Sequence, residues 1–131
     1  MNEKLIRYGH YYDKLYESME EEIELVQFQH VMLEVAKNMY KDGQRDEEFI
    51  DKTIEVLKDF IKVGKEVAIK FNTLIMINDK IMSVAKRLGT FEMINEHLGI
   101  EQRNEDFRMN VEILTDKEHE EFLDELLQLK M

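Results

Sequence analysis

The stretch that decides the fold is IDKTIEVLKDFIKVGKEVAIKFNTLIMINDKIMSVAKRL, residues 50–88. Apolar side chains recur in it every seven residues, in one series that starts at Ile50 and a second that starts at Ile54. Such repeats place both series on one side of a helix, where another helix packs. An acidic first turn, and a basic last turn followed by Gly89, mark the two ends. The pattern predicts one long helix over residues 46–88.

Two residues, Gly64 and Asn78, interrupt this apolar seam. A polar residue at a core position often fixes the register or the oligomeric state of packed helices. Local kinking of the helix is the alternative interpretation, because glycine weakens a helix interior. Both interpretations stay open from the sequence.

The segment before this helix predicts a second long helix, over residues 3–41, that ends at the turn signal Asp42-Gly43. Its apolar residues recur at intervals of three, four or seven along one face. A second stripe with the same spacing begins halfway along and lies nearly opposite the first. A helix that is apolar on two sides needs two partners. The second stripe consists of Leu25, Phe28, Met32, Val35 and Met39.

The C-terminal third predicts two shorter helices, over residues 90–98 and 116–130. Thr115 and Glu118 match a capping box at the start of the second one. Between the two helices, residues 107–113 alternate strictly between apolar and polar side chains, which is typical of an extended segment. We therefore expect a strand there, or a plain connector that leads to the cap, although the spacing of Phe107, Val111 and Leu114 also fits a helix.

Composition and charge exclude several classes of protein. The chain has 131 residues, which predicts a single domain, and 44% of them are hydrophobic. The absence of Cys removes disulfides, thiolate zinc sites and Cys nucleophiles. The net charge of −11 repels phosphate backbones, so we expect no direct nucleic-acid binding. The N-terminus shows no secretory signal and no apolar run approaches bilayer length, so we expect a cytoplasmic protein without membrane contact.

These patterns together predict an all-α fold: a long antiparallel, coiled-coil-like helical hairpin with a small C-terminal helical cap. An isolated hairpin of this kind cannot cover both stripes of its first helix. Exposed apolar stripes favour association, so we expect a homodimer whose helices complete a bundle.

Two carboxylate motifs are the best catalytic candidates. Residues 20–25 contain an EExxEL pattern and residues 47–51 contain an EExxD pattern. Paired carboxylates on two helices can converge on Mg²⁺, which prefers oxygen ligands. The order of the motifs resembles that of the all-α MazG-like nucleoside triphosphate pyrophosphatases, although here EExxD falls in the first turn of its helix. That resemblance implies a nucleotide substrate and four Mg²⁺ ligands: Glu21, Glu24, Glu48 and Asp51.

Outside this resemblance the sequence predicts no metal, cofactor or catalytic set. His119, with Asp116 and Glu120, matches either a weak surface ion site or a solvated acidic helix. The function favoured by the sequence is non-enzymatic: an adaptor, assembly chaperone or inhibitor that binds itself and an unidentified protein. An acidic nucleic-acid mimic that inhibits a DNA-binding enzyme is a further alternative. The residues expected at the protein interface are Tyr11, Leu25, Phe28, Met32, Val35 and Met39.

Overall fold

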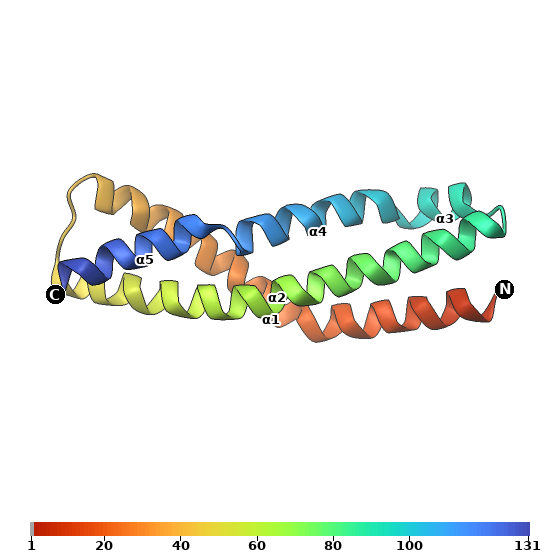
Figure 1. Cartoon of the computed structure of the whole chain (residues 1–131), viewed down its shortest axis with the longest axis horizontal. Coiled ribbons are helices and arrows are strands. Elements are labelled where there is room, and N and C mark those ends of the chain that lie inside the picture. The colour runs from red at the N-terminus through yellow and green to blue at the C-terminus, as the bar shows by residue number, and fades with distance from the viewer. Residues whose placement is uncertain (1) are drawn as a thin grey trace. The chain divides into compact units, whose positions relative to one another are not determined.

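The computed structural model describes residues 2–131, which form the predicted all-α fold (Figure 1). No strand occurs among these residues. Two long helices come first and three shorter ones follow. None of these helices combines the length and the apolar character that crossing a bilayer requires. The helices are α1 (Glu3–Lys41), α2 (Glu47–Arg87), α3 (Phe91–Leu98), α4 (Ile100–Leu114) and α5 (Lys117–Leu129).

The two long helices begin and end where the sequence predicts. The bounds of α1 match residues 3–41, and α2 departs from the predicted 46–88 by one residue at each end. The seven-residue series that starts at Ile50 lies in the core: Ile50, Leu57 and Phe71 are buried. The first stripe of α1 lies in the core as well. Its buried members are Tyr12, Met19, Val26, Leu33 and Tyr40.

Both turns that follow the long helices close on a glycine with a left-handed backbone. Gly43 has a φ of 104° and Gly89 a φ of 71°, values that other residues adopt only with strain. After α1, the amide of Gln44 donates to the carbonyl oxygen of Met39 at 3.0 Å, as in a Schellman motif. These glycines end the helices and allow the chain to reverse direction.

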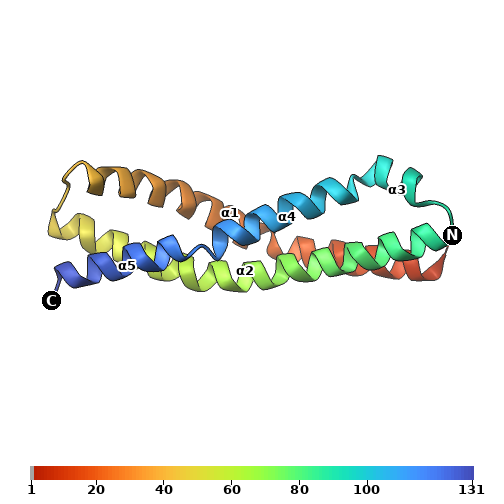
Figure 2. The same ribbon diagram turned by 45° about the horizontal axis from the view of Figure 1, so that its top comes forward.

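The chain divides into two compact units, and both long helices run through both of them. The first unit consists of the chain up to Glu20 together with Ala68–Ile113. The second consists of Glu21–Val67 together with Leu114–Met131. Each unit contains a segment of α1, a segment of α2 and helices from the C-terminal third. Figure 2 shows the same helices from a second direction.

In the first unit, α4 packs on α1 and α2 through aromatic rings and one buried polar pair. The Phe107 ring lies 5.3 Å from that of Phe71 and 6.5 Å from that of Tyr12, between ring centroids. The side-chain amide of Asn78 donates to Oδ1 of Asn104 at 2.8 Å, and both residues are 1% exposed. The polar interruption at Asn78 therefore matches a polar residue on a neighbouring helix of the same chain.

The prediction of a strand or connector over residues 107–113 was wrong, because the segment belongs to α4. The buried residues Ile100, Asn104 and Phe107 are spaced four and three apart, which is helical spacing. Met109, expected on the same face as Phe107, is 60% exposed. A helix satisfies its backbone groups internally, whereas a lone strand leaves its ladder groups unpaired.

In the second unit, α5 packs on α1 and α2. The Phe122 ring meets the ring of Tyr40 at 5.5 Å, and the His119 ring meets that of Phe60 at 4.8 Å, between centroids. Leu126 is fully buried. Three side chains of α5 thus form the contact that holds it to the long helices.

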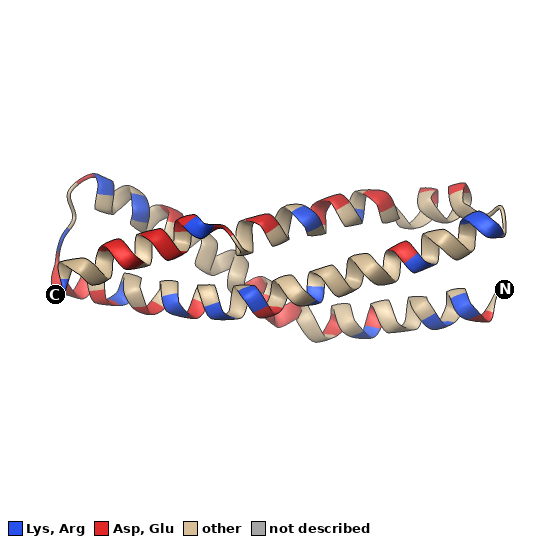
Figure 3. Cartoon of the chain, in the orientation of Figure 1, with Lys and Arg blue, Asp and Glu red and all other residues tan. Residues whose placement is uncertain are grey.

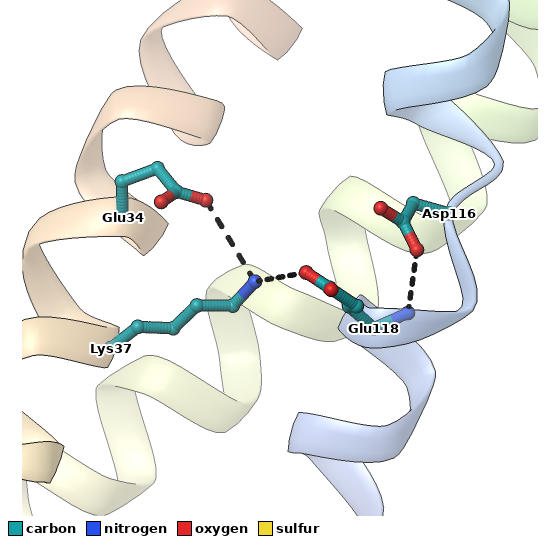
Figure 4. A network of polar contacts seen from close by, with 4 residues as sticks. All are labelled: Glu34, Lys37, Asp116 and Glu118. Atoms are coloured by element: carbon teal, nitrogen blue, oxygen red, sulfur yellow. Dashed lines mark hydrogen bonds and ion pairs between the residues drawn. The ribbon is translucent and has the colours of Figure 1, made fainter.

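The N-cap of α5 is Asp116, one residue later than the predicted Thr115. The carboxylate of Asp116 accepts a hydrogen bond from the amide of Glu118 at 2.9 Å. The Glu118 side chain points instead toward Lys37, whose ammonium lies 3.9 Å from Glu118 and 3.7 Å from Glu34 (Figure 4). Glu118 therefore links α5 to α1 and does not complete a capping box.

Gly64 provides close packing and does not end or divide α2, which is helical from Glu47 to Arg87. A Cβ atom at position 64 would lie 3.3 Å from the carbonyl oxygen of Leu114, at the end of α4. Such a separation is tighter than ordinary van der Waals contact. The backbone at Leu114 therefore approaches α2 where only glycine leaves enough room.

In each unit the C-terminal helices cover one side of the long helices. The sequence predicts that a small C-terminal cap and a second copy of the chain together provide this cover. Acidic positions recur along α5 (Figure 3). One of them, Glu120, lies 3.1 Å from the ammonium of Lys65 on α2. Both side chains are at least half exposed, so this ion pair contributes little to the stability of the fold.

Candidate functional site

The second apolar stripe of α1 is exposed along its whole length. Phe28 exposes 64% of its surface and Val35 exposes 54%. The intervals of three and four residues are those of a coiled-coil seam, and Val31 widens the stripe on one flank. The structure thus confirms a second apolar face on α1 and leaves it uncovered within the second unit. Its exposed members are Leu25, Phe28, Val31, Met32, Val35 and Met39.

This stripe forms one wall of an open groove in the second unit, which we call the α1–α2 groove. Its volume is about 330 Å³. Residues of α1 and α2 line the groove, and Leu33 and Ala36 of α1 are among them. Helix α5 packs on Tyr40, which does not line the groove. Leu25 and Phe28 extend the apolar wall beyond the lining residues. The other wall consists of Phe49, Lys52, Thr53 and Val56 of α2.

The polar groups in the groove are already engaged. The hydroxyl of Thr53 donates to the carbonyl oxygen of Phe49 at 2.7 Å, within α2. The ammonium of Lys52 lies 3.6 Å from the carboxylate of Glu48. The groove therefore offers mainly apolar surface, which suits the apolar side chains of a ligand.

A hydrogen bond between the walls fixes their spacing. The side-chain amide of Gln29 donates to Oδ2 of Asp59 at 2.6 Å, and Gln29 is 7% exposed. Because Asp59 stays on the surface while Gln29 is buried, the bond reaches from the core side of α1 to the outer edge of α2. The groove is held open by packed helices and does not depend on a loop.

Sequence reasoning found the α1 wall and missed the α2 wall. Phe49, Val56 and Val63 are seven residues apart and stand beside the two series that fill the core. Phe49 and Val56 line the groove, and Val63 is half-buried. This third seven-residue series was the available signal.

Tyr11, the remaining interface candidate, is 52% exposed. It belongs to the first unit, whereas the groove belongs to the second. Its neighbour Tyr12 is buried against Phe107. Tyr11 is therefore an exposed side chain on its own and is no part of the groove.

The structure does not bring together the four carboxylates of the pyrophosphatase alternative. Gln29 lies level with Asp59, so Glu24 lies level with the region near residue 64, some 13 to 16 residues from Asp51 and Glu48. At 1.5 Å per residue, the two motifs are about 20 to 25 Å apart along the helices. Among residues 2–131, no three His, Asp or Glu side chains are arranged to hold a metal ion.

Two of these carboxylates have basic neighbours. Glu48 pairs with Lys52, as described above. Asp51 contacts the ammonium of Lys130 at the end of the chain, and this hydrogen bond raises the pKa of Lys130. All four carboxylates are exposed, which is typical of solvated surface charges.

His119 is buried, so neither a surface ion site nor a solvated helix face describes it. It is 3% exposed, and its ring lies 6.1 Å from the ring of His30, between centroids. Phe60 lies against both imidazoles. No pattern in the sequence indicates this cluster, because its three rings come from three different helices.

No protein-family model, curated protein or solved structure matches this chain.

Proposed function

We propose that this protein is non-enzymatic and acts through protein–protein interaction, by accepting an apolar helix of another protein in the α1–α2 groove. The exposed stripe from Leu25 to Met39 carries this proposal. Covering one Leu, Phe or Met side chain is worth about 1.5–3 kcal/mol when burial is complete. Several such side chains in one row therefore provide a strong drive toward association.

The geometry favours a helix as the ligand. The stripe repeats at three and four residues, and a helix laid along it meets the groove with apolar residues at the same intervals. Adaptors, assembly chaperones and inhibitors of other proteins all use surfaces of this kind. As part of the proposal the protein acts in the cytoplasm, which fractionation of the source cells tests.

A capture experiment with matched variants tests the proposed function. Phe28→Asp places a charge in the middle of the stripe. Ile69→Asp is the control, because Ile69 is exposed to nearly the same degree, 66%, and lies on α2 in the first unit. Circular dichroism checks that both variants remain helical.

We expect the wild type and Ile69→Asp to retain the same protein from a lysate of the source cells, and Phe28→Asp to lose it. Retention of identical proteins by all three forms contradicts the proposal, because the groove then plays no part in capture.

A further inference from the structure

The outer edges of the α1–α2 groove are mainly acidic. At about 100° per residue, Glu24 falls in the same sector of α1 as Val31 and Val35. On α2 the sector next to Val56 contains four charged residues. All the charged side chains of both edges are exposed. Those of α2 are Glu48, Lys52, Asp59 and Glu66.

The single basic residue of this set does not offset the acidic ones. Lys52 lies 3.6 Å from Glu48, so these two charges largely neutralise each other. Asp59 accepts its hydrogen bond from the neutral amide of Gln29, which brings no positive charge to it. One acidic residue on α1, Glu24, and two on α2, Asp59 and Glu66, therefore remain along the groove.

These charges distinguish between occupants. A second copy of the chain would bring the same acidic edges against the first, and like charges beside a helical seam disfavour pairing. A helix with Lys or Arg beside its apolar stripe would instead meet opposite charge on both walls. Such contacts raise the association rate and select the partner.

We propose that the α1–α2 groove binds an amphipathic helix of another protein whose apolar stripe is flanked by Lys and Arg. This inference rests on the proposed function and names the chemistry of its partner. The stripe from Leu25 to Met39 is about 21 Å long. It therefore takes about four turns of the partner helix, with apolar residues at intervals of three and four.

Binding of two synthetic peptides tests the inference. Both are fluorescently labelled helices of about 18 residues with Leu at every seam position, long enough to span the groove. One has Lys beside the seam and the other has Glu at the same positions. Fluorescence anisotropy with the full chain measures Kd for each.

We expect the Lys-edged peptide to bind at least about tenfold more tightly than the Glu-edged one at low salt. The difference should shrink as the salt concentration rises from about 0.05 to 0.5 M, because the charges are exposed. Phe28→Asp should weaken the Lys-edged complex at least about tenfold, while Ile69→Asp leaves it unchanged.

Charge reversal at the edges separates the two parts of the argument. Glu24→Lys and Glu66→Lys leave the apolar walls intact. Each should weaken binding of the Lys-edged peptide about two- to fivefold and strengthen binding of the Glu-edged one.

Three results overturn the inference, and they differ in what they mean for the proposed function. Equal, groove-dependent binding of both peptides rejects the basic partner and leaves the groove as a helix-binding site. A dimer of the free chain that Phe28→Asp dissociates rejects it in favour of a second copy. Binding of neither peptide by a monomeric chain rejects both the inference and the proposed function.

Discussion

Replacing the buried Asn78–Asn104 pair by leucine tests the packing of α4 on α2. The variant Asn78→Leu removes the donor of the 2.8 Å hydrogen bond and leaves Oδ1 of Asn104 buried without it. The lost hydrogen bond costs about 0.5–1.5 kcal/mol, and the stranded acceptor costs about 1–3 kcal/mol. Each residue is 1% exposed, so water cannot replace the lost partner. We expect a loss of about 2–4 kcal/mol in the free energy of unfolding.

Asn104→Leu should cost a similar amount, because it strands the amide of Asn78. It also removes the 3.2 Å hydrogen bond from Asn104 to Asp79, whose carboxylate is exposed and can turn to water. The double variant contains two leucines in place of the two asparagines, so neither side-chain amide is left buried without its partner. Its free energy of unfolding should fall by about 1 kcal/mol or less, which gives a coupling energy of about 3 kcal/mol or more.

Urea denaturation followed by circular dichroism measures the four free energies of this cycle. If the losses of the two single variants add in the double variant to within about 0.5 kcal/mol, the two amides do not depend on each other and the reasoning is wrong.

Three further predictions follow from single sites. Gly9→Ala should raise the free energy of unfolding, measured by urea denaturation, by about 0.5–1 kcal/mol, because a Cβ atom at position 9 meets nothing within 4 Å. Gly64→Ala should give no such gain, because a Cβ atom at position 64 crowds Leu114. Millimolar Mg²⁺ should leave the melting temperature unchanged, and a rise that Glu24→Gln abolishes would revive the metal-site alternative. Burial raises the pKa of Tyr12 above its ordinary value of 10.0, so the unfolded chain loses this proton at a lower pH than the folded chain. The free energy of unfolding therefore falls as the pH rises above 10.0. Tyr12→Phe should remove part of that fall, as measured by alkaline denaturation.

The long helices were predictable because their signal is local. Apolar side chains repeat every seven residues along α2, so the core face could be read without knowing what it packs against. The same holds for the exposed stripe of α1, whose five members lie on one helix.

The rest depended on contacts between helices. Asn104 occupies a core position of α4 and hides the apolar repeat that begins at Ile100, and only its pairing with Asn78 explains it. The α2 wall of the groove has a seven-residue series of its own, but that such a series stays uncovered follows from where α5 packs. His119 shows the same limit, because an imidazole in an acidic helix gives no local sign of burial.

A spin label in the groove tests the central claim, that this surface is a docking site for a basic amphipathic helix. The chain contains no cysteine, so Val31→Cys provides one labelling site at the edge of the groove and Ile69→Cys a control in the first unit. Electron paramagnetic resonance should show a mobile label at both positions in the free protein. The Lys-edged peptide should immobilise the label at position 31 and leave the one at position 69 mobile. A label at position 31 that is equally mobile with and without saturating peptide, or already immobilised by a second copy, would contradict the account.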